Sequence, residues 1–237
     1  MAMKLTIFQT GHVPSSLRPQ FGTYPTMFER MFDRTGERFS YETVAVSDGE
    51  PLPDPAQLEG VVITGSPAGV YDDYAWLGPL RQFIRQAYAA RTPMAGICFG
   101  HQIMADALGG DVRKSDKGWG IGRHSYKVRN RPAFMRAAPA ELAIACSHQD
   151  QVLVAPREAE VILASDFTPN AGLAYRNGAA LSFQPHPEFE DPYSIALAEM
   201  RRGDAPDPVV EKALASFETP SQSLDVAGYI ARFFTQR

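Results

Sequence analysis

Along the first half of the chain, the spacing of hydrophobic residues changes repeatedly between the pattern of a strand and that of a helix. Four short apolar or alternating runs predict β-strands, at residues 4–9, 39–46, 60–64 and 94–97. Three segments predict helices because apolar residues recur every three or four positions, at residues 24–32 (ended by Gly36), 76–91 and 99–108. The last two strands are apolar throughout, which is typical of strands buried on both faces. The alternation predicts an α/β fold whose open, twisted sheet is parallel at its centre and flanked by helices.

The middle of the chain has a different pattern. Six short β-like runs are separated by turn residues, at residues 122–129, 143–146, 151–154, 161–164, 172–176 and 179–183. They predict antiparallel hairpins added to the sheet. Beyond Pro192 the pattern is helical, and Val226, Ile230, Phe233 and Phe234 predict one packing face. Neither an internal repeat nor a low-complexity linker interrupts the sequence. We therefore expect a single domain over residues 1–237, with a core at about 3–190 and a helical tail at 191–237.

Composition narrows the class of protein. Of the 237 residues, 44% are hydrophobic and 21% are charged, which is enough apolar material for a folded core. The net charge of −4 favours no nucleic-acid partner. No apolar run approaches the roughly 18 residues of a membrane helix, and no signal peptide is visible. The two cysteines, Cys98 and Cys146, make no disulfide framework. These features predict a cytoplasmic protein that binds a small molecule.

Cys98 stands between two glycines, where a buried strand turns directly into a helix. Residues 96–102 read Gly-Ile-Cys-Phe-Gly-His-Gln, which is the cysteine form of a nucleophile elbow. A sharp turn projects the side chain from the carboxyl edge of the sheet, and the helix N-terminus favours a thiolate. The alternative is a small buried cysteine without chemistry. Cys146 lacks flanking glycines and a following helix, so we expect it to be structural.

His186 is the candidate base. It follows the run at 179–183, and Pro185 and Pro187 keep its surroundings out of a helix. Glu188 is two residues further on and is placed to orient the imidazole, which completes a triad in the general sense. The alternative is a histidine in a proline-rich turn. No pair of histidines has zinc-ligand spacing, so we expect neither a metal nor a cofactor.

An attack on a carbonyl also needs backbone N–H donors for the oxyanion. The amide of Phe99, directly after the candidate nucleophile, is the natural first donor. The loop at residues 64–70 supplies a second from Gly65 or Ser66, because it follows a neighbouring buried strand. The alternative is an ordinary glycine turn, and the loop matches no phosphate-binding pattern.

Taken together, these motifs resemble those of the class I, or triad, glutamine amidotransferases. The family signature combines Gly-x-Cys-x-Gly-His-Gln with a later His-Pro-Glu, which match residues 96–102 and 186–188. The loop at 64–70 also resembles the family's oxyanion loop, and residues 147–150 are similar to a stretch in the guanylate synthetase branch. Two positions differ, since many members have glycine at Ser66 and an aromatic residue at Pro185. The motifs span about residues 5–190, and the resemblance implies a flavodoxin-like fold.

The resemblance also implies roles for individual residues. Cys98 would be the nucleophile, His186 the base and Glu188 its orienter, in an enzyme that cleaves a γ-glutamyl amide through a γ-glutamyl thioester. Phe99 and Ser66, or its neighbour Gly65, would lend oxyanion donors. Four further residues would face the α-amino and α-carboxylate groups of the substrate: Gln102, Ser147, His148 and Asp150.

The leaving group and the partner stay open at this point. The sequence after Glu188 is too short for an ATP-binding synthetase, so we expect ammonia to pass to a separate synthetase subunit or to have no acceptor. The alternative within the class is a γ-glutamyl peptidase or hydrolase that acts on glutathione-like compounds or γ-glutamyl amines. A non-catalytic glutamine-binding module and a cysteine hydrolase of unrelated acyl groups are the alternatives outside it.

Overall fold

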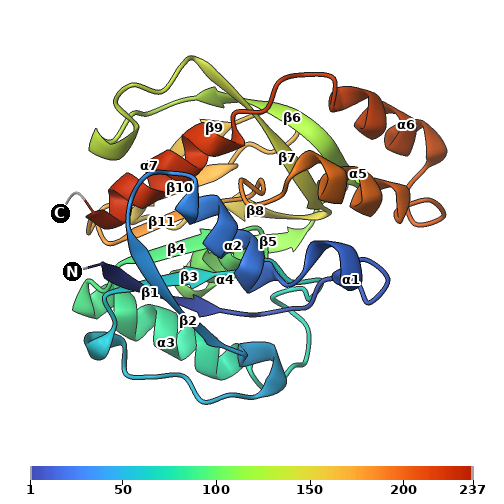
Figure 1. Ribbon diagram of the computed structural model, residues 1–237. Coiled ribbons are helices and arrows are strands. Elements are labelled where there is room, and N and C mark those ends of the chain that lie inside the picture. The colour runs from blue at the N-terminus through green and yellow to red at the C-terminus, as the bar shows by residue number, and fades with distance from the viewer. Residues whose placement is uncertain (1, 236–237) are drawn as a thin grey trace.

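The computed structural model describes residues 2–235, so Met1, Gln236 and Arg237 of the predicted 1–237 domain lie outside the described residues. The strands are β1 (Met3–Phe8), β2 (Phe39–Val44), β3 (Gly60–Ile63), β4 (Met94–Ile97), β5 (Asp111–Lys114), β6 (Gly120–Val128), β7 (Glu141–His148), β8 (Asp150–Val154), β9 (Ala159–Ala164), β10 (Gly172–Tyr175) and β11 (Ala180–Phe183). The helices are α1 (Arg18–Phe21), α2 (Tyr24–Asp33), α3 (Leu77–Ala90), α4 (Phe99–Ala107), α5 (Asp191–Glu199), α6 (Asp207–Ser216) and α7 (Ser223–Thr235). Figure 1 shows their arrangement.

A nine-stranded mixed sheet forms the centre of the molecule, in the order β2-β1-β3-β4-β11-β10-β9-β6-β7. The first five strands of this order pair in parallel. The remaining four are joined by antiparallel pairing. The predicted open α/β sheet with a parallel centre, flanking helices and added antiparallel strands is therefore confirmed.

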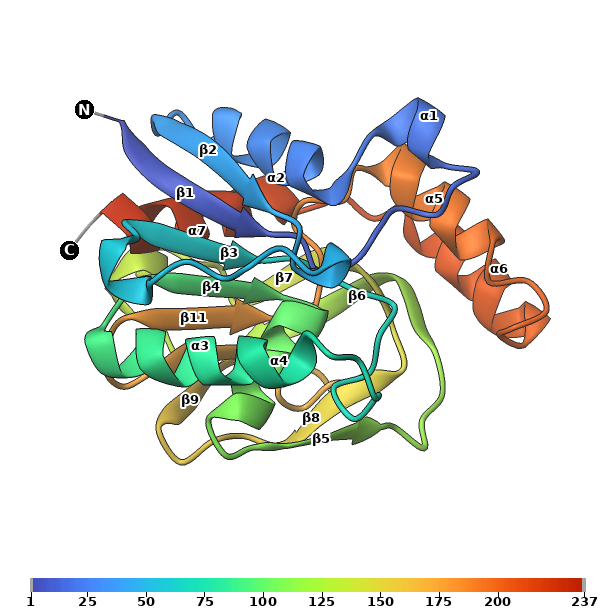
Figure 2. The same cartoon turned by 90° about the horizontal axis from the view of Figure 1, so that it is seen from below.

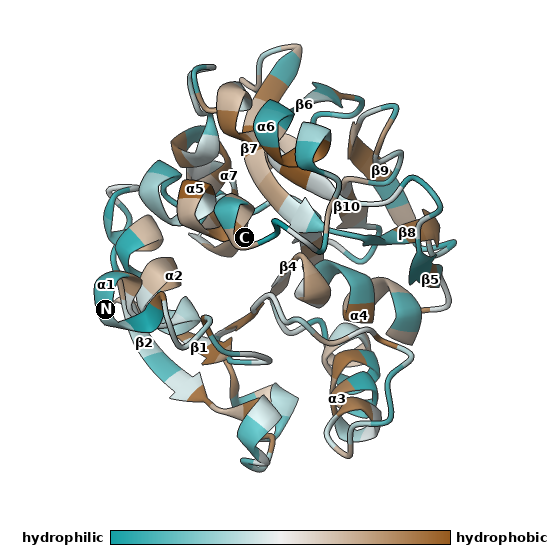
Figure 3. Cartoon of the chain, turned by 90° about the vertical axis from the view of Figure 1, so that its right-hand side faces the viewer, coloured by the Kyte–Doolittle hydropathy of each residue, from teal (hydrophilic) through white to brown (hydrophobic). Residues whose placement is uncertain are grey.

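Helices cover both faces of the sheet, which Figure 2 shows with α3 and α4 on one side and α2 and α7 on the other. Strand β3 illustrates why its sequence is apolar throughout. Val62 packs in the core beneath α2 and α7, whereas Val61 and Ile63 pack in the core beneath α3 and α4. Successive side chains of a strand point to opposite faces, so a strand covered on both sides carries no polar alternation. In Figure 3 the central strand β4 is brown, while α3 carries both teal and brown segments.

The run at 179–183 forms a predicted antiparallel hairpin, because β11 pairs with β10. On its other side β11 pairs in parallel with β4, which joins the hairpins to the parallel part of the sheet. All four residues of β11 are buried, as in β3 and β4. The prediction for the run at 151–154 was wrong in detail, because this run does not extend the main sheet. It forms β8, which pairs with β5 in a separate two-stranded sheet. Strand β5 reads Asp-Val-Arg-Lys and has no apolar alternation that could have predicted it.

The predicted helical tail is confirmed as α5, α6 and α7, within the described residues. Val226, Ile230, Phe233 and Phe234 of α7 are buried in the core shared with α2, as their spacing predicts. Helix α1 is a single turn that the pattern of apolar residues did not predict. Within residues 2–235, no helix is long and apolar enough to cross a membrane.

Candidate functional site

Cys98 occupies the turn between β4 and α4 in a backbone conformation that is rare for a residue with a side chain, with φ 54° and ψ −103°. The flanking glycines make this turn feasible. A Cβ atom on Gly96 would lie 2.5 Å from the carbonyl oxygen of Gly100, and one on Gly100 would collide with the carbonyl oxygen of Ile63. The spacing Gly-x-Cys-x-Gly is therefore a steric requirement of strand and helix packing at this edge.

His186 and Glu188 form a buried pair at the end of β11. The His186 Nδ1–H group donates to Glu188 Oε1 at 2.7 Å, and both residues are 4% exposed. The backbone N–H of His186 donates to the carbonyl of Ala145 at 2.8 Å. The ring of Phe189 stacks on the imidazole with centroids 3.9 Å apart and planes 5° apart. The orientation of the imidazole is thus determined by a carboxylate at one edge and an aromatic ring on one face.

The structure brings Cys98 next to His186. Burial alone lowers the pKa of His186, but the charge of Glu188 and the charge and hydrogen bond of Cys98 outweigh burial and raise it. Gly65 borders both residues, since a Cβ atom on it would lie 3.0 Å from His186 Cε1 and 3.7 Å from Cys98 Cβ. These contacts bring a thiol, an imidazole and a carboxylate next to one another, which is an arrangement suited to transferring a proton from sulfur to nitrogen.

Gln184 reaches the same sulfur from the strand side. Its Nε2 group donates to Cys98 Sγ at 3.6 Å, and its Oε1 accepts from Gln102 Nε2 at 3.2 Å. Gln102 Nε2 also donates to the carbonyl of Asp150 at 2.9 Å. The amide of Gln102, predicted to face substrate, therefore also joins the sulfur side of the site to the segment around Asp150. Sequence reasoning assigned no role to Gln184, although it lies two residues before His186.

The candidate oxyanion donors lie around the same sulfur. Phe99 is the first residue of α4, where a backbone N–H has no acceptor within the helix. Gly65 and Ser66 follow β3, the strand that pairs with β4. The hydroxyl of Ser66 accepts from the backbone N–H of Ala68 at 3.1 Å, which closes the turn of this loop. The backbone amides that follow two neighbouring parallel strands, β3 and β4, are thus brought to one edge of the sheet, beside Cys98.

A cleft of about 400 Å³ opens over Cys98. Its lining includes five of the residues predicted from sequence: Ser66, Gln102, Ser147, His148 and Asp150. The hydroxyl of Ser147 is buried without a hydrogen-bond partner among the described residues, so it has unused donor and acceptor capacity at the cleft. Burial lowers the pKa of His148 to about 3, and its Nδ1–H donates to the carbonyl of Asp150 at 3.1 Å. His148 is therefore a neutral residue of the cleft wall.

Asp150 is the acidic residue of this cleft that faces Tyr71. The Tyr71 hydroxyl donates to Asp150 Oδ1 at 3.0 Å across the cleft. Burial raises the pKa of Asp150, while the hydrogen bond from Tyr71 and the charge of Lys114 act in the opposite direction. Lys114 lies directly opposite Asp150 in the pairing of β5 with β8. Sequence reasoning missed Tyr71 and Lys114, which approach Asp150 only through the packing of separate loops and strands.

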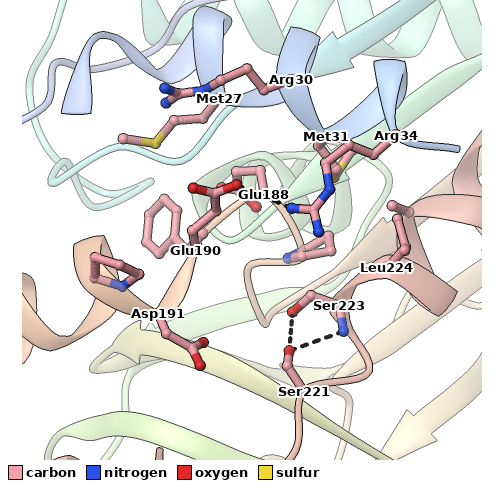
Figure 4. A pocket seen from close by; sticks show the side chains of 14 residues that line it. Met27, Arg30, Met31, Arg34, Glu188, Glu190, Asp191, Ser221, Ser223 and Leu224 are labelled. Atoms are coloured by element: carbon pink, nitrogen blue, oxygen red, sulfur yellow. Dashed lines mark hydrogen bonds and ion pairs between the residues drawn. The ribbon is translucent and has the colours of Figure 1, made fainter.

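A second cavity, of about 320 Å³, is lined by Glu188 but not by Cys98. Figure 4 shows Arg30 and Arg34 on its α2 side and Ser221 and Ser223 at the approach to α7. Arg34 pairs with Glu190 at 3.1 Å, and Arg30 donates to the carbonyl of Phe21 at 2.8 Å. The lining of this cavity includes no cysteine, so the chemistry of the thiol belongs to the cleft over Cys98.

The remaining cysteine and histidines fit structural positions. Burial raises the pKa of Cys146 to about 12, which leaves this thiol protonated and unreactive. Burial lowers the pKa of His101 to about 3, and a hydrogen bond of 2.8 Å joins its Nδ1 to the hydroxyl of Ser182. Among residues 2–235, no group of three or more histidine, cysteine, aspartate or glutamate residues is arranged to hold a metal ion.

Known proteins resemble this chain in sequence and in fold. The family model "Glutamine amidotransferase class-I" matches residues 27–192. The chain is 31% identical to γ-glutamyl peptidase 3 of Arabidopsis thaliana over 182 residues, which cover 73% of this chain and 72% of that protein. It is 29% identical to one subunit of the glutamine-hydrolysing GMP synthase of Ignicoccus hospitalis over 163 residues, covering 69% of this chain and 84% of that protein.

A solved glutamine amidotransferase from Thermotoga maritima has the same fold. Its TM-score is 0.75 at 24% identity, over 100% of this chain and 98% of that chain. The match of the family model includes the elbow at Cys98 and the segment of His186 and Glu188. The chain belongs to the class I glutamine amidotransferase family.

Proposed function

We propose that the protein hydrolyses a γ-glutamyl amide, with Cys98 as nucleophile, His186 as general acid and base, and Glu188 as the residue that orients His186. The observation that carries this proposal is the buried line from Cys98 through His186 to Glu188 beneath the cleft. The relatives named γ-glutamyl peptidase and GMP synthase support a hydrolytic reaction at a γ-glutamyl group.

The reaction starts with proton transfer from Cys98 to His186. The thiolate attacks the γ-carbonyl carbon, and the electron pair of the C=O bond moves to oxygen. Backbone N–H groups of Phe99 and of Gly65 or Ser66 stabilise that oxyanion. When the C–N bond breaks, the His186 imidazolium gives its proton to the departing amine, and a γ-glutamyl thioester remains on Cys98.

Water completes the cycle. His186, now neutral, takes a proton from a water molecule that attacks the thioester carbonyl. The second oxyanion collapses, the C–S bond breaks, and the thiolate is restored with glutamate as the acid product. The hydrogen bond to Glu188 holds the Nδ1–H tautomer, so that Nε2 is the nitrogen available for both proton transfers.

The cleft wall supplies recognition of the glutamyl group in this proposal. Asp150 attracts the α-ammonium group, and the unpartnered hydroxyl of Ser147 donates to or accepts from the substrate. Gln102 and His148 hold the carbonyl of Asp150 from both sides. A chain with this site releases ammonia from glutamine for a separate synthetase subunit, or releases a larger amine as a γ-glutamyl peptidase does.

The test compares the two free cysteines by measuring turnover of a γ-glutamyl amide and formation of a covalent glutamyl adduct. Cys98→Ala should abolish hydrolysis of γ-glutamyl amides, and the wild-type enzyme mixed rapidly with substrate and quenched in acid should carry a glutamyl adduct on Cys98 by mass spectrometry. Cys146→Ala is the matched control, because it removes the other buried thiol, and it should keep both turnover and adduct. Turnover by Cys98→Ala, or an adduct on another residue, would overturn the proposal.

A further inference from the structure

Gln184 is a buried side chain that contacts the sulfur of Cys98, and the reaction proposed above makes no use of it. Its Nε2 group donates to Cys98 Sγ at 3.6 Å. Gln184 has an exposed fraction of 0%, so water does not compete for this amide. A buried polar group depends on the partners that the fold provides. The contact with sulfur is therefore a fixed feature of the site.

The main chain holds Gln184 beside Cys98. The parallel register of β11 and β4 pairs Phe183 with Ile97, so the residues that follow them, Gln184 and Cys98, lie side by side where the strands end. The N–H of Cys98 donates to the carbonyl of Phe183 at 2.8 Å, and the N–H of Gln184 donates to the carbonyl of Ala171 at 2.8 Å. The approach of the amide to the sulfur is thus set by the pairing of the sheet.

A chain of hydrogen bonds decides which end of the Gln184 amide faces the sulfur. The backbone carbonyl of Asp150 can only accept, so the group of Gln102 that faces it at 2.9 Å is Nε2. The same nitrogen lies 3.2 Å from the side chain of Gln184, which therefore presents its acceptor Oε1 there. The opposite end of the amide, the donor Nε2, is left for Cys98 Sγ.

An N–H donor favours the anionic form of the sulfur, because its hydrogen bond is stronger to a thiolate than to a thiol. In the proposed cycle the sulfur of Cys98 is anionic twice. It is a thiolate before it attacks the γ-carbonyl, and again when the C–S bond of the thioester breaks and the electron pair stays on sulfur. The amide of Gln184 keeps its own protons throughout, and His186 remains the group that accepts the proton of the thiol.

The other groups that titrate near Cys98 leave this role to Gln184 and His186. The charge of Cys98 acts on the pKa values of His186, Tyr24, Tyr126 and Cys146. Burial raises the pKa values of Tyr24 and Cys146 to about 12 and that of Tyr126 well above its ordinary value, so these three stay protonated near pH 7. The cleft lining adds four charged side chains: Asp72, Lys114, Asp150 and Arg201. A variant of Gln184 changes none of these groups, so a change in the titration of the sulfur reports on the amide.

We propose that Gln184 is a further catalytic residue, whose side-chain N–H stabilises the thiolate of Cys98 both as nucleophile and as leaving group. The hydrogen bond from Gln102 is the positioning contact that directs this amide at the sulfur. The inference rests on the proposed γ-glutamyl hydrolysis for its place in the cycle, whereas the contact with sulfur needs no substrate.

The test is the pH dependence of Cys98 alkylation by iodoacetamide, followed by mass spectrometry of the peptide that contains Cys98. Gln184→Met keeps the length of the side chain without its N–H donor, and it should move the midpoint of the rate profile to higher pH by about 1 unit. The acid limb of kcat/KM for a γ-glutamyl amide should move by the same amount, because hydrolysis needs the same thiolate. Gln102→Met keeps the Gln184 amide but releases its orientation, so it should move the midpoint in the same direction by less. Alkylation of the buried Cys146 reports any unfolded protein in each sample.

Gln151→Met is the matched control and should keep the wild-type midpoint. Gln151 is a buried glutamine outside the cleft lining, and its Nε2 has no hydrogen-bond partner among the described residues. A wild-type midpoint in Gln184→Met would overturn the role of Gln184. If that variant unfolds and exposes Cys146, a wild-type midpoint in Gln102→Met overturns it instead.

Two further outcomes separate this inference from the proposed function. A loss of kcat/KM in Gln184→Met that is equal at every pH would overturn the inference, because Gln184 would then support only the shape of the site. If the wild-type enzyme hydrolyses no γ-glutamyl amide and forms no adduct on Cys98, the proposed function fails. The alkylation midpoints then still decide whether Gln184 stabilises the thiolate.

Discussion

Gly65 faces the imidazole of His186 so closely that a methyl group on its Cα would stand 3.0 Å from His186 Cε1. The same methyl group would approach Cys98 Cβ to 3.7 Å. The imidazole has little freedom to retreat, because Phe189 stacks on one of its faces and Glu188 holds its Nδ1. The distance between Gly65 and His186 thus links the loop after β3 to the geometry of proton transfer.

Gly65→Ala should therefore displace the imidazole by a few tenths of an ångström and lower kcat by about 10- to 100-fold, because proton transfer depends steeply on alignment. Gly78→Ala is the matched control: a Cβ atom on Gly78 meets nothing within 4 Å, and the residue is in helix α3 with ordinary φ. Steady-state kinetics of both variants, with thermal unfolding, make the comparison. Wild-type kcat in Gly65→Ala would show that the imidazole does not depend on this contact.

Glu188→Gln should move the alkaline limb of the kcat/KM profile to lower pH. Burial opposes the charged imidazole, and the charge of Glu188 is the largest influence that raises the pKa of His186. A raised pKa keeps the imidazolium protonated as pH rises, so removing the carboxylate makes it lose its proton at lower pH. We expect a shift of about 1 unit or more.

Glu190→Gln is the control for this pH profile, because Glu190 is exposed and pairs with Arg34 rather than with His186. Its profile should match the wild type. Rates of Cys98 alkylation by iodoacetamide, measured across the same pH range, report the thiolate directly. A Glu188→Gln profile that coincides with the wild type, or moves to higher pH, contradicts the assigned role of Glu188.

Asp150→Asn should raise KM for a γ-glutamyl substrate by about 10- to 100-fold, through the loss of one charge-assisted contact to the α-ammonium group. The monoamide of glutaric acid lacks that ammonium group, so wild-type and Asp150→Asn enzymes should handle it alike. This double comparison isolates one pair of interacting groups. Tyr71→Phe should have a smaller effect, because it removes only the hydrogen bond to Asp150 Oδ1. If Asp150→Asn raised KM equally for both substrates, the proposed contact between Asp150 and the α-ammonium group would be ruled out.

Acid should destabilise the fold before most carboxylates titrate. Burial lowers the pKa values of His101 and His148 to about 3, whereas unfolded histidine titrates near 6.5. Their contribution to stability is thus present above about pH 6.5 and is lost as pH falls toward the folded pKa values. For two such groups the free energy of unfolding should drop by about 2 to 3 kcal/mol between pH 7 and pH 5.5.

His186 acts in the opposite direction over the same range. Its pKa is raised to about 10, so its contribution is fully present below the unfolded value and is lost as pH rises toward the folded one. Acidification from pH 7 to pH 5.5 therefore regains somewhat less than about 1 kcal/mol of unfolding free energy, which leaves a drop of about 1.5 to 2 kcal/mol from His101, His148 and His186 together. Burial also lowers the pKa of His124, which acts in the same direction as His101 and His148.

Denaturant unfolding at the two pH values measures this net drop. His101→Gln removes one of the two buried neutral imidazoles, so it should reduce the drop by about 1 kcal/mol. His12→Gln is the control, because His12 is half-exposed and pairs with the exposed Asp48. A free energy of unfolding that is equal at pH 7 and pH 5.5 would mean that His101 and His148 are not buried in neutral form.

Local spacing was enough to predict the parts of the site that lie within a few residues of one another. Gly96 precedes Cys98 because a Cβ atom there would meet the carbonyl oxygen of Gly100, a constraint that acts within five residues. Gly100 is constrained instead by the carbonyl oxygen of Ile63 on the neighbouring strand β3. His186 and Glu188 are two residues apart, and their hydrogen bond forms within one extended segment. The parallel strands β3 and β4 were equally predictable, because burial on both faces leaves four consecutive apolar or small residues in each.

Contacts between distant segments were not predictable in this way. Gln184 reaches Cys98 Sγ because β11 pairs in parallel with β4, whereas the turn pattern around residues 179–183 predicted only its hairpin with β10. Turn residues show where strands end but not which strand lies beside which. That choice depends on the total apolar area buried by the whole sheet.

The sequence by itself determined the elbow at Cys98, the pair of His186 and Glu188 and the alternation of elements that builds an α/β sheet, since each follows from steric and hydrogen-bonding demands on neighbouring residues. Only the tertiary structure decided that Tyr71 meets Asp150 and that Arg201 stacks on Trp119 within the cleft. These pairs depend on the packing of α5 against β6 and β7 and on the pairing of β5 with β8 apart from the main sheet. Their energies depend on distances that no local pattern of residues encodes.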